Sequence, residues 1–223
     1  MTPPEIYRTG DGERDMPGWQ IRVTPNKYPL STVHEVIVHS PEHTALLDMN
    51  PEQVEGLFQV FRNRFHHRRP EGQVIIFSNQ GVSAGASLAH PHSQLVVVPP
   101  NIPLQTLNRQ PVANILKENE SSLSYQPEYL EWPHELWLAP KKEKTWFNEM
   151  TDVEIKDFTE LFQGALRHLS QVKRSQYPQL QELGYNFYIY QGKNWYLRII
   201  PRFVQRAGFE LATGIQVNEM LHG

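Results

Sequence analysis

Residues 73–98 read QVIIFSNQGVSAGASLAHPHSQLVVV, and this stretch decides how the first half of the chain folds. Its two ends, residues 73–78 and 94–98, are short runs of β-branched and apolar side chains, which favour strands. The stretch between them contains glycine and ends in His90-Pro91-His92. It therefore predicts a loop that leads directly into the second strand.

A strand and a helix are expected just before this stretch. Residues 33–39 (VHEVIVH) are largely β-branched and predict a strand. Asn50, Pro51 and Gln53 have the order of a helix start, with a capping residue, a proline and a side chain that can reach back. The apolar residues that follow at helical spacing are Val54, Leu57, Phe58, Phe61 and Phe65. The first half is thus strand, helix, strand, strand.

The second half appears in the sequence as a repeat of this order. Residues 134–139 predict a strand, and residues 186–191 and 195–200 predict two more after a helix. Thr151 and Glu154 form a capping box at the start of that helix. The residues that it is expected to bury are Val153, Phe158, Leu161, Phe162, Ala165, Leu166, Leu169 and Val172.

These patterns predict an α+β fold in which helices flank an antiparallel sheet. We divide the chain into related halves at residues 1–100 and 132–223. Residues 101–131, rich in Pro, Asn, Gln and Ser, are expected to connect them, with one weakly helical stretch near residues 112–119.

Composition excludes several classes of function. The 223 residues carry a formal net charge of −3 and no long basic run, so we expect no nucleic-acid partner. No apolar stretch reaches about 18 residues and the N-terminus lacks an apolar leader, which disfavours membrane spanning and secretion. The absence of cysteine excludes disulfides and thiolate metal sites and is compatible with a cytoplasmic protein.

Three polar side chains are expected to meet where the second strand begins. Alternation along a strand points His90, His92 and Gln94 to one face. A neutral imidazole can attack phosphorus without prior deprotonation, and a carbonyl can orient its other nitrogen. Gln94 offers an amide donor to a phosphoryl oxygen and supplies no acidic proton. A metal-binding pair, or two surface histidines in a turn, is the alternative interpretation.

The loop before these residues suits a phosphate. Gly81 and Gly85 allow the backbone to approach an anion closely. Ser87 adds a hydroxyl donor.

The whole segment resembles the galactose-1-phosphate uridylyltransferase family, a branch of the histidine-triad superfamily. Residues that match its signature in order and spacing are Asn79, Gly81, Gly85, Ser87, His90, His92 and Gln94. The resemblance extends to residues 24–29, which look like the family's base- and ribose-binding segment and include Asn26, Lys27 and Tyr28. It also covers residues 40–43, 200–202 and 207–211, of which the last, with Phe209 and Glu210, looks like the sugar-contacting stretch.

The resemblance implies two fused histidine-triad units and a two-step transfer. His92 would attack the α-phosphorus of a nucleoside-diphosphate sugar, and a sugar 1-phosphate would then take the nucleotidyl group. In the hydrolytic relatives a histidine stands at the position of Gln94, so glutamine favours transfer over hydrolysis. Aligning Pro99 with Pro201 places Asn194 opposite His92 and Tyr196 opposite Gln94, so only the first half would be catalytic. A homodimer is implied as well.

The chain departs from the family at its zinc site. Relatives often hold a structural zinc with two cysteines and two histidines, and only His43 and His90 remain here. The chain is expected to begin just past the missing cysteine pair. Because structural zinc takes four ligands, we expect no bound zinc and no other cofactor. A surface histidine at a strand end is an equal interpretation of His43.

Three functions stay open at this point. The first is a nucleotidyltransferase that acts on a nucleotide sugar and a sugar 1-phosphate, through His92 and Gln94. The second is a nucleotide-binding protein that has lost turnover. The third is a nucleotide-sugar phosphorylase or hydrolase. Arg198 and Arg202 are candidates to neutralise a sugar phosphate, although alternation does not say which face they share.

Overall fold

The computed structural model describes residues 3–104 and 108–215, and ten strands within them form one antiparallel sheet. The strands of the first half are β1 (Tyr7–Gly10), β2 (Trp19–Pro25), β3 (Val33–Val38), β4 (Gln73–Gln80) and β5 (His92–Val98). Those that follow are β6 (Val112–Glu118), β7 (Ser122–Pro127), β8 (Leu136–Pro140), β9 (Tyr185–Ile189) and β10 (Leu197–Pro201). The α-helices are α1 (Pro51–Arg68), α2 (Asp152–Gln176) and α3 (Gly208–Thr213). The short 3₁₀ turns are η1 (Arg69–Glu71), η2 (Val82–Ala84) and η3 (Phe147–Glu149).

The strand order reads the same from either edge of the sheet. From one edge it is β1-β2-β3-β5-β4, and from the other it is β6-β7-β8-β10-β9. The two sets meet where β4 pairs with β9, with Phe77 opposite Tyr188 and Asn79 opposite Asn186. α1 follows β3 and α2 follows β8. The predicted α+β fold of two similar halves is confirmed.

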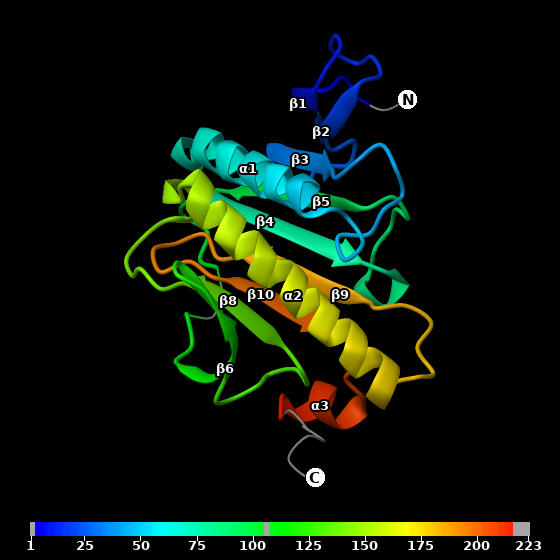
Figure 1. Cartoon of the computed structure of the whole chain (residues 1–223), viewed down its shortest axis with the longest axis vertical. Helices are drawn as coiled ribbons and strands as arrows, with labels where there is room; N and C mark the ends of the chain where they lie inside the picture. The colour runs from blue at the N-terminus through cyan, green and yellow to red at the C-terminus, as the bar shows by residue number, and fades with distance from the viewer. Residues whose placement is uncertain (1–2, 105–107, 216–223) are drawn as a thin grey trace.

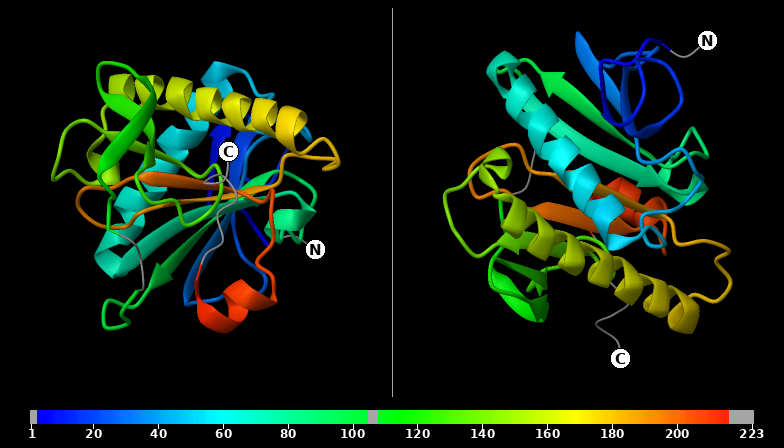
Figure 2. Two further views of the ribbon diagram at one scale, coloured as in Figure 1. Left: turned by 90° about the horizontal axis from the view of Figure 1, so that it is seen from below. Right: turned by 45° about the horizontal axis from the view of Figure 1, so that its top comes forward.

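Both long helices cover the same face of the sheet. α1 and α2 lie side by side across it in Figure 1, and Figure 2 shows α3 on the other side of the sheet from α2. Phe58 of α1 contacts Phe162 of α2, with ring centroids 5.1 Å apart. Phe61, Phe65 and Phe158 are also buried between helices and sheet. The aromatic stripes of both helices are therefore core. Within the described residues, no helix has the length and apolar character needed to cross a membrane.

The predicted helix starts are confirmed in detail. In α1 the Gln53 amide nitrogen donates to Asn50 Oδ1 at 2.8 Å, and the Asn50 nitrogen donates to Gln53 Oε1. Thr151 and Glu154 cap α2 in the same way. The expected burial of Val153 is wrong, because its side chain is 71% exposed whereas that of Ile155 is buried. Val153 lies about 200° around the helix from Ile155 and so faces solvent.

The segment between the halves differs from its prediction. Residues 112–119 were expected to be weakly helical, but Val112–Glu118 is β6, which pairs with β7. Pairing with a neighbouring strand overrides the weak helical tendency of a short segment. Residues 101–131 thus supply two strands of the sheet, as β1 and β2 do for the first half. The proposed limits of the two halves remain a prediction.

A buried ion pair ties β3 to α1. Glu35 lies on the helix-covered face and is 1% exposed. Arg64 donates to both oxygens of its carboxylate, from Nε at 2.9 Å and from Nη2 at 2.5 Å. Arg68 adds a third hydrogen bond from Nε at 2.7 Å. Removal of this carboxylate would leave the largely buried Arg64 guanidinium without its partner.

We expect Glu35→Ala to lower the free energy of unfolding by about 3–5 kcal/mol, because it leaves a buried cation unpaired. The control is Glu71→Ala, which removes the exposed carboxylate that Arg68 Nη1 contacts at 2.7 Å. That change should cost at most about 1 kcal/mol. Urea unfolding at neutral pH measures both, and equal losses would contradict the role given to Glu35.

Candidate functional site

A pocket opens on the face of the sheet that the helices leave uncovered. It has a volume of about 810 Å³, and β2, β3 and β5 supply its floor with side chains that include Thr24, Val36, Val38, His92 and Gln94. Alternation explains this set, because Ile37 and Leu95, the neighbours of these residues along the strands, point into the helix-covered core. The same rule that builds the core thus brings polar side chains together on the opposite face.

His92 is held in place through one of its ring nitrogens. Its side chain is 7% exposed and lines the pocket. Nδ1 lies 2.9 Å from the carbonyl oxygen of His90. Because a carbonyl oxygen can only accept a hydrogen bond, Nδ1 carries the proton of the neutral ring. Nε2 then keeps its lone pair. The hydroxyl of Ser78 donates to the His92 carbonyl at 2.9 Å and fixes the backbone beneath the ring.

Gln94 lies two residues further along β5 and is held by a second polar cluster. Its Oε1 is 2.8 Å from His34 Nε2 and 3.3 Å from Asn26 Nδ2. The Leu30 backbone nitrogen donates to the other ring nitrogen of His34 at 3.0 Å. Burial lowers the pKa of His34 below its usual value, which keeps the ring neutral.

His34 was missed by the sequence reasoning, which treated residues 33–39 only as a strand. A signal was available, because His34 shares its face with Val36 and Val38 by alternation. The hydrogen bond between His34 and Gln94 could not be predicted from the sequence. This contact depends on the register of β3 against β5, in which Val36 lies opposite Gln94.

The predicted phosphate loop is shaped by the second half of the chain. The Val82 backbone nitrogen donates to Glu182 Oε1 at 2.8 Å, and a Cβ on Gly81 would come within 2.7 Å of the same oxygen. Asn186 donates to Asn79 Oδ1 at 2.8 Å. Gly85, with φ of +77°, ends the η2 turn in the left-handed region.

The predicted nucleotide-binding residues divide into two groups. Ser87, Asn26, Lys27 and Tyr28 line the pocket. Tyr28 is 75% exposed at its rim, and its nitrogen donates to Asn26 Oδ1. The lining does not include Asn79, Gly81 or Gly85, whose phosphate-binding role remains a prediction.

The predicted sugar-contacting residues lie elsewhere. Phe209 and Glu210 belong to α3, at the opposite end of the sheet from β1–β3 in Figure 1. Phe209 is 54% exposed, and Glu210 accepts a hydrogen bond from the Ala207 nitrogen that caps α3. The fold of one chain therefore does not bring these two residues to the pocket of that chain.

Arg198 and Arg202 are also engaged elsewhere. Arg198 is buried and bonded to Glu135 and Glu131. Arg202 lies over the ring of Trp132, with its guanidinium carbon 4.6 Å from the ring centroid. Neither arginine lines the pocket.

His43 and His90 lie together, as expected for the remains of a metal site. Their ring centroids are 4.2 Å apart, and the rings are nearly perpendicular. His90 Nε2 is 2.7 Å from the Ser40 carbonyl, to which it donates. Over residues 3–104 and 108–215, no group of three or more His, Cys, Asp or Glu is arranged to hold a metal. Two histidines, one of them already bonded through Nε2, do not match the four ligands of structural zinc.

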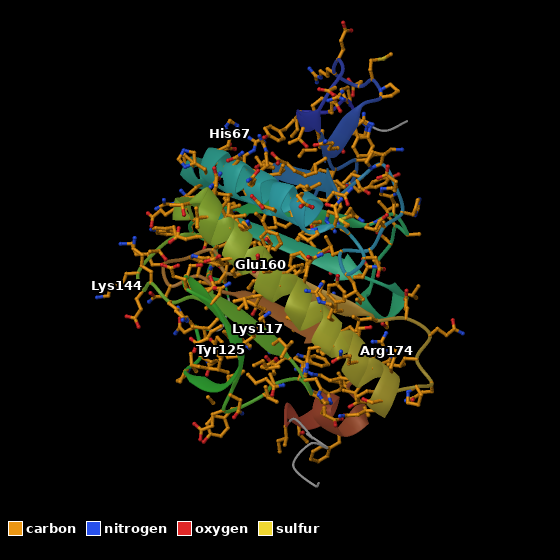
Figure 3. The ribbon with its side chains drawn as sticks, viewed as in Figure 1. His67, Lys117, Tyr125, Lys144, Glu160 and Arg174 are labelled. Atoms are coloured by element: carbon orange, nitrogen blue, oxygen red, sulfur yellow. The ribbon has the colours of Figure 1, made fainter. Side chains whose placement is uncertain are left out.

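Aromatic side chains occupy the corresponding face of the second half. Trp137 of β8 packs on Tyr196, with ring centroids 4.2 Å apart. Tyr196 also stacks on Tyr190 at 5.1 Å. Tyr125 of β7, labelled in Figure 3, packs on Trp137. Tyr196 is the residue that the alignment of the two halves places opposite Gln94, so the second half has a ring where the first half has an amide.

One further histidine lies next to His92, on the other face of the sheet. His39 is buried on the helix-covered side, with Nε2 2.8 Å from the hydroxyl of Ser93. Burial, and to a smaller extent the nearby His92 and His90, together lower the pKa of His39 to about 3. The folded protein therefore holds this imidazole neutral.

We expect His39 to make stability depend on pH. As pH falls below 6.5, His39 takes up a proton in the unfolded chain but not in the folded one, so the free energy of unfolding decreases toward pH 3. The loss is at most about 1.4 kcal/mol per pH unit. His39→Gln, which keeps a donor near Ser93, should flatten the slope between about pH 6.5 and pH 5, measured by urea unfolding. His67→Gln, at an exposed position on α1, is the control, and an unchanged slope in His39→Gln would refute this role.

Comparisons with known proteins point to galactose-1-phosphate uridylyltransferase-like relatives. Residues 29–98, from before β3 to the end of β5, match the model of the galactose-1-phosphate uridyl transferase N-terminal domain. ADP-glucose phosphorylase of Arabidopsis thaliana is 25% identical over 96% of this chain and 74% of its own length. Galactose-1-phosphate uridylyltransferase of Thermotoga maritima is 26% identical over 64% of this chain, which spans about half, 53%, of that relative.

The fold agrees as well. A crystal structure of the Arabidopsis thaliana ADP-glucose phosphorylase with bound ADP-glucose superposes with a TM-score of 0.79. The two proteins are 23% identical, and the match covers 97% of this chain and 82% of the other. The resemblance seen in the sequence is confirmed: residues 29–98 match the galactose-1-phosphate uridyl transferase N-terminal domain, and the chain is similar to an ADP-glucose phosphorylase and to galactose-1-phosphate uridylyltransferases.

Proposed function

We propose that this chain transfers a nucleoside monophosphate from a nucleoside-diphosphate sugar to a sugar 1-phosphate, through a covalent nucleotidyl group on His92. The observation that carries the proposal is the hydrogen bond from His92 Nδ1 to the His90 carbonyl, which leaves the lone pair on Nε2. An imidazole held in this way is a nucleophile at neutral pH. Its place in a pocket of nucleotide size supports the same reaction.

In the first step Nε2 of His92 attacks the α-phosphorus. A bond from nitrogen to phosphorus forms as the bond to the bridging oxygen breaks, and sugar 1-phosphate leaves with that oxygen. The ring becomes cationic, and the His90 carbonyl stabilises the proton on Nδ1. The Gln94 amide donates to a phosphoryl oxygen as charge develops on it, and the Ser87 hydroxyl adds a second donor.

In the second step a phosphate oxygen of the acceptor attacks the same phosphorus, and the bond to Nε2 breaks. No proton has to be supplied, because the acceptor phosphate attacks as an anion and the His92 ring leaves as a neutral imidazole with its proton still on Nδ1. Gln94 suits this step, since an amide does not activate water as a base would. Transfer is therefore favoured over hydrolysis.

The remaining predicted residues receive substrate roles in this proposal. Asn26, Lys27 and Tyr28 would hold the base and ribose at the pocket rim. The loop that carries Gly81 and Gly85 would approach the phosphates with its backbone. Phe209 and Glu210 lie away from the pocket of their own chain, so their sugar-contacting role would require a homodimer.

Inorganic phosphate is the second candidate acceptor. It is favoured by the Arabidopsis relative, an ADP-glucose phosphorylase that matches 96% of this chain. The first step would be the same, but attack by phosphate would release a nucleoside diphosphate in place of a new nucleotide sugar. Because that relative is named for ADP-glucose, adenine is the candidate base in this case.

The first step predicts a labelled protein. Incubation with UDP-glucose or ADP-glucose labelled in the α-phosphate should give an acid-labile adduct on His92, located by mass spectrometry. His92→Ala should abolish it, whereas His67→Gln, on α1 and outside the pocket lining, should leave it unchanged. Nucleotide binding without an adduct, unaffected by His92→Ala, would instead indicate a binding protein that has lost turnover.

The second step predicts which acceptor discharges the adduct. Separate portions of the isolated adduct are incubated with galactose 1-phosphate, with glucose 1-phosphate, with inorganic phosphate or with buffer alone. A nucleotide sugar is the product expected from the sugar phosphates, and a nucleoside diphosphate is the product expected from phosphate. Rapid release of nucleoside monophosphate in buffer alone would contradict the role given to Gln94.

A further inference from the structure

The orientation of the Gln94 amide is set by a chain of hydrogen bonds that begins outside the pocket. The Leu30 backbone N–H can only donate, and it donates to His34 Nδ1 at 3.0 Å. Nδ1 is therefore the acceptor of the neutral ring, and Nε2 carries the proton. Nε2 lies 2.8 Å from Gln94 Oε1 and 3.1 Å from Asn26 Nδ2, and of these two atoms only Oε1 can accept, so the Nε2 proton lies in the hydrogen bond to Gln94.

This bond decides which end of the Gln94 side chain faces the substrate. Oε1 accepts from His34 Nε2 and, more weakly, from Asn26 Nδ2 at 3.3 Å, which uses its two acceptor positions. The NH₂ group is left for the pocket. In the flipped orientation NH₂ would meet the N–H of His34, donor against donor, and the amide oxygen would face the phosphoryl oxygens. The flipped amide would repel the charge that the observed one stabilises.

We propose that His34 is a positioning residue that holds the Gln94 amide with its NH₂ group toward the transferred phosphoryl group. The proposal rests on the function proposed above and deepens it, because it names what makes Gln94 a donor. His34 does not line the pocket, so it acts only through Gln94. A rigid ring with an acceptor at one end and a donor at the other spans the distance from the Leu30 backbone to Gln94.

The neutral state of His34 is part of the same arrangement. A second ring proton would lie on Nδ1 and face the Leu30 N–H, again donor against donor. Burial lowers the pKa of His34 and so favours the neutral ring. The single proton is thereby kept on Nε2, where it is needed.

Two matched substitutions separate this role from simple packing. In His34→Gln the side-chain NH₂ falls near the position of Nε2 and can still donate to Gln94 Oε1. In His34→Asn the amide falls near Nδ1 and cannot reach Gln94. The two side chains differ by one methylene, and thermal unfolding of each confirms that both variants are folded.

The rate of nucleotidyl-His92 formation in a single turnover tests the proposal. His34→Asn should slow this step by about ten- to a hundredfold, which is less than the loss of about a hundred- to a thousandfold that removal of a transition-state donor causes. Nucleotide affinity should remain within about twofold, because His34 does not line the pocket. His34→Gln should retain most of the rate.

A double-mutant cycle gives the sharpest outcome. If His34 acts only through Gln94, the His34→Asn/Gln94→Ala protein should be no slower than Gln94→Ala alone. Additive losses, equal rates for His34→Gln and His34→Asn, or a loss confined to nucleotide affinity would overturn the proposal.

A measurement that does not need activity keeps the two proposals separate. In ¹⁵N-labelled protein, long-range ¹H–¹⁵N spectra report which nitrogen of His34 is protonated. The proton is expected on Nε2 at pH 7, and a proton on Nδ1 would overturn the positioning role. If no donor forms an adduct on His92 while the proton is on Nε2, the proposed reaction fails and the hydrogen-bonded arrangement stands.

Discussion

Packing of α1 and α2 on one face of the sheet is the constraint on which the rest of the molecule depends. Each strand of the central sheet must present apolar side chains to these helices at every second position. Glu35 is a charged side chain at one of these positions, and Arg64 and Arg68 donate hydrogen bonds to its carboxylate. The intervening positions, among them His34, His92 and Gln94, are thereby directed to the uncovered face. The candidate site therefore lies on the face of the sheet opposite to the hydrophobic core.

The pairing of β4 with β9 makes the site a product of both halves. β4 leads directly into the loop before His90, and β9 carries Asn186, which donates to Asn79 and to the Ala84 carbonyl. Glu182, just before β9, binds the start of the same loop. The first half supplies the candidate reactive side chains, whereas residues of the second half bind the loop next to them. The second half thus supports the loop without supplying the candidate reactive residues.

Different side chains occupy the uncovered face of the sheet in the two halves. In the first half, small and polar side chains leave a pocket of about 810 Å³. In the second half, Trp137, Tyr190 and Tyr196 stack over the corresponding strands. Aromatic rings bury large areas and so stabilise the sheet without a helix on that side. Filling that space with aromatic rings excludes a ligand from it.

The sequence by itself determined the central elements and the shared face of His92 and Gln94. Strand alternation, helical spacing and capping boxes act over a few residues, so residues 33–39, Asn50 and Thr151 could be interpreted locally. Only the tertiary structure decided that residues 112–119 form a strand, and that Glu182 and Asn186 hold the loop. It also decided that His34 meets Gln94, 60 residues away. Such contacts depend on the register between distant strands, which no local pattern records.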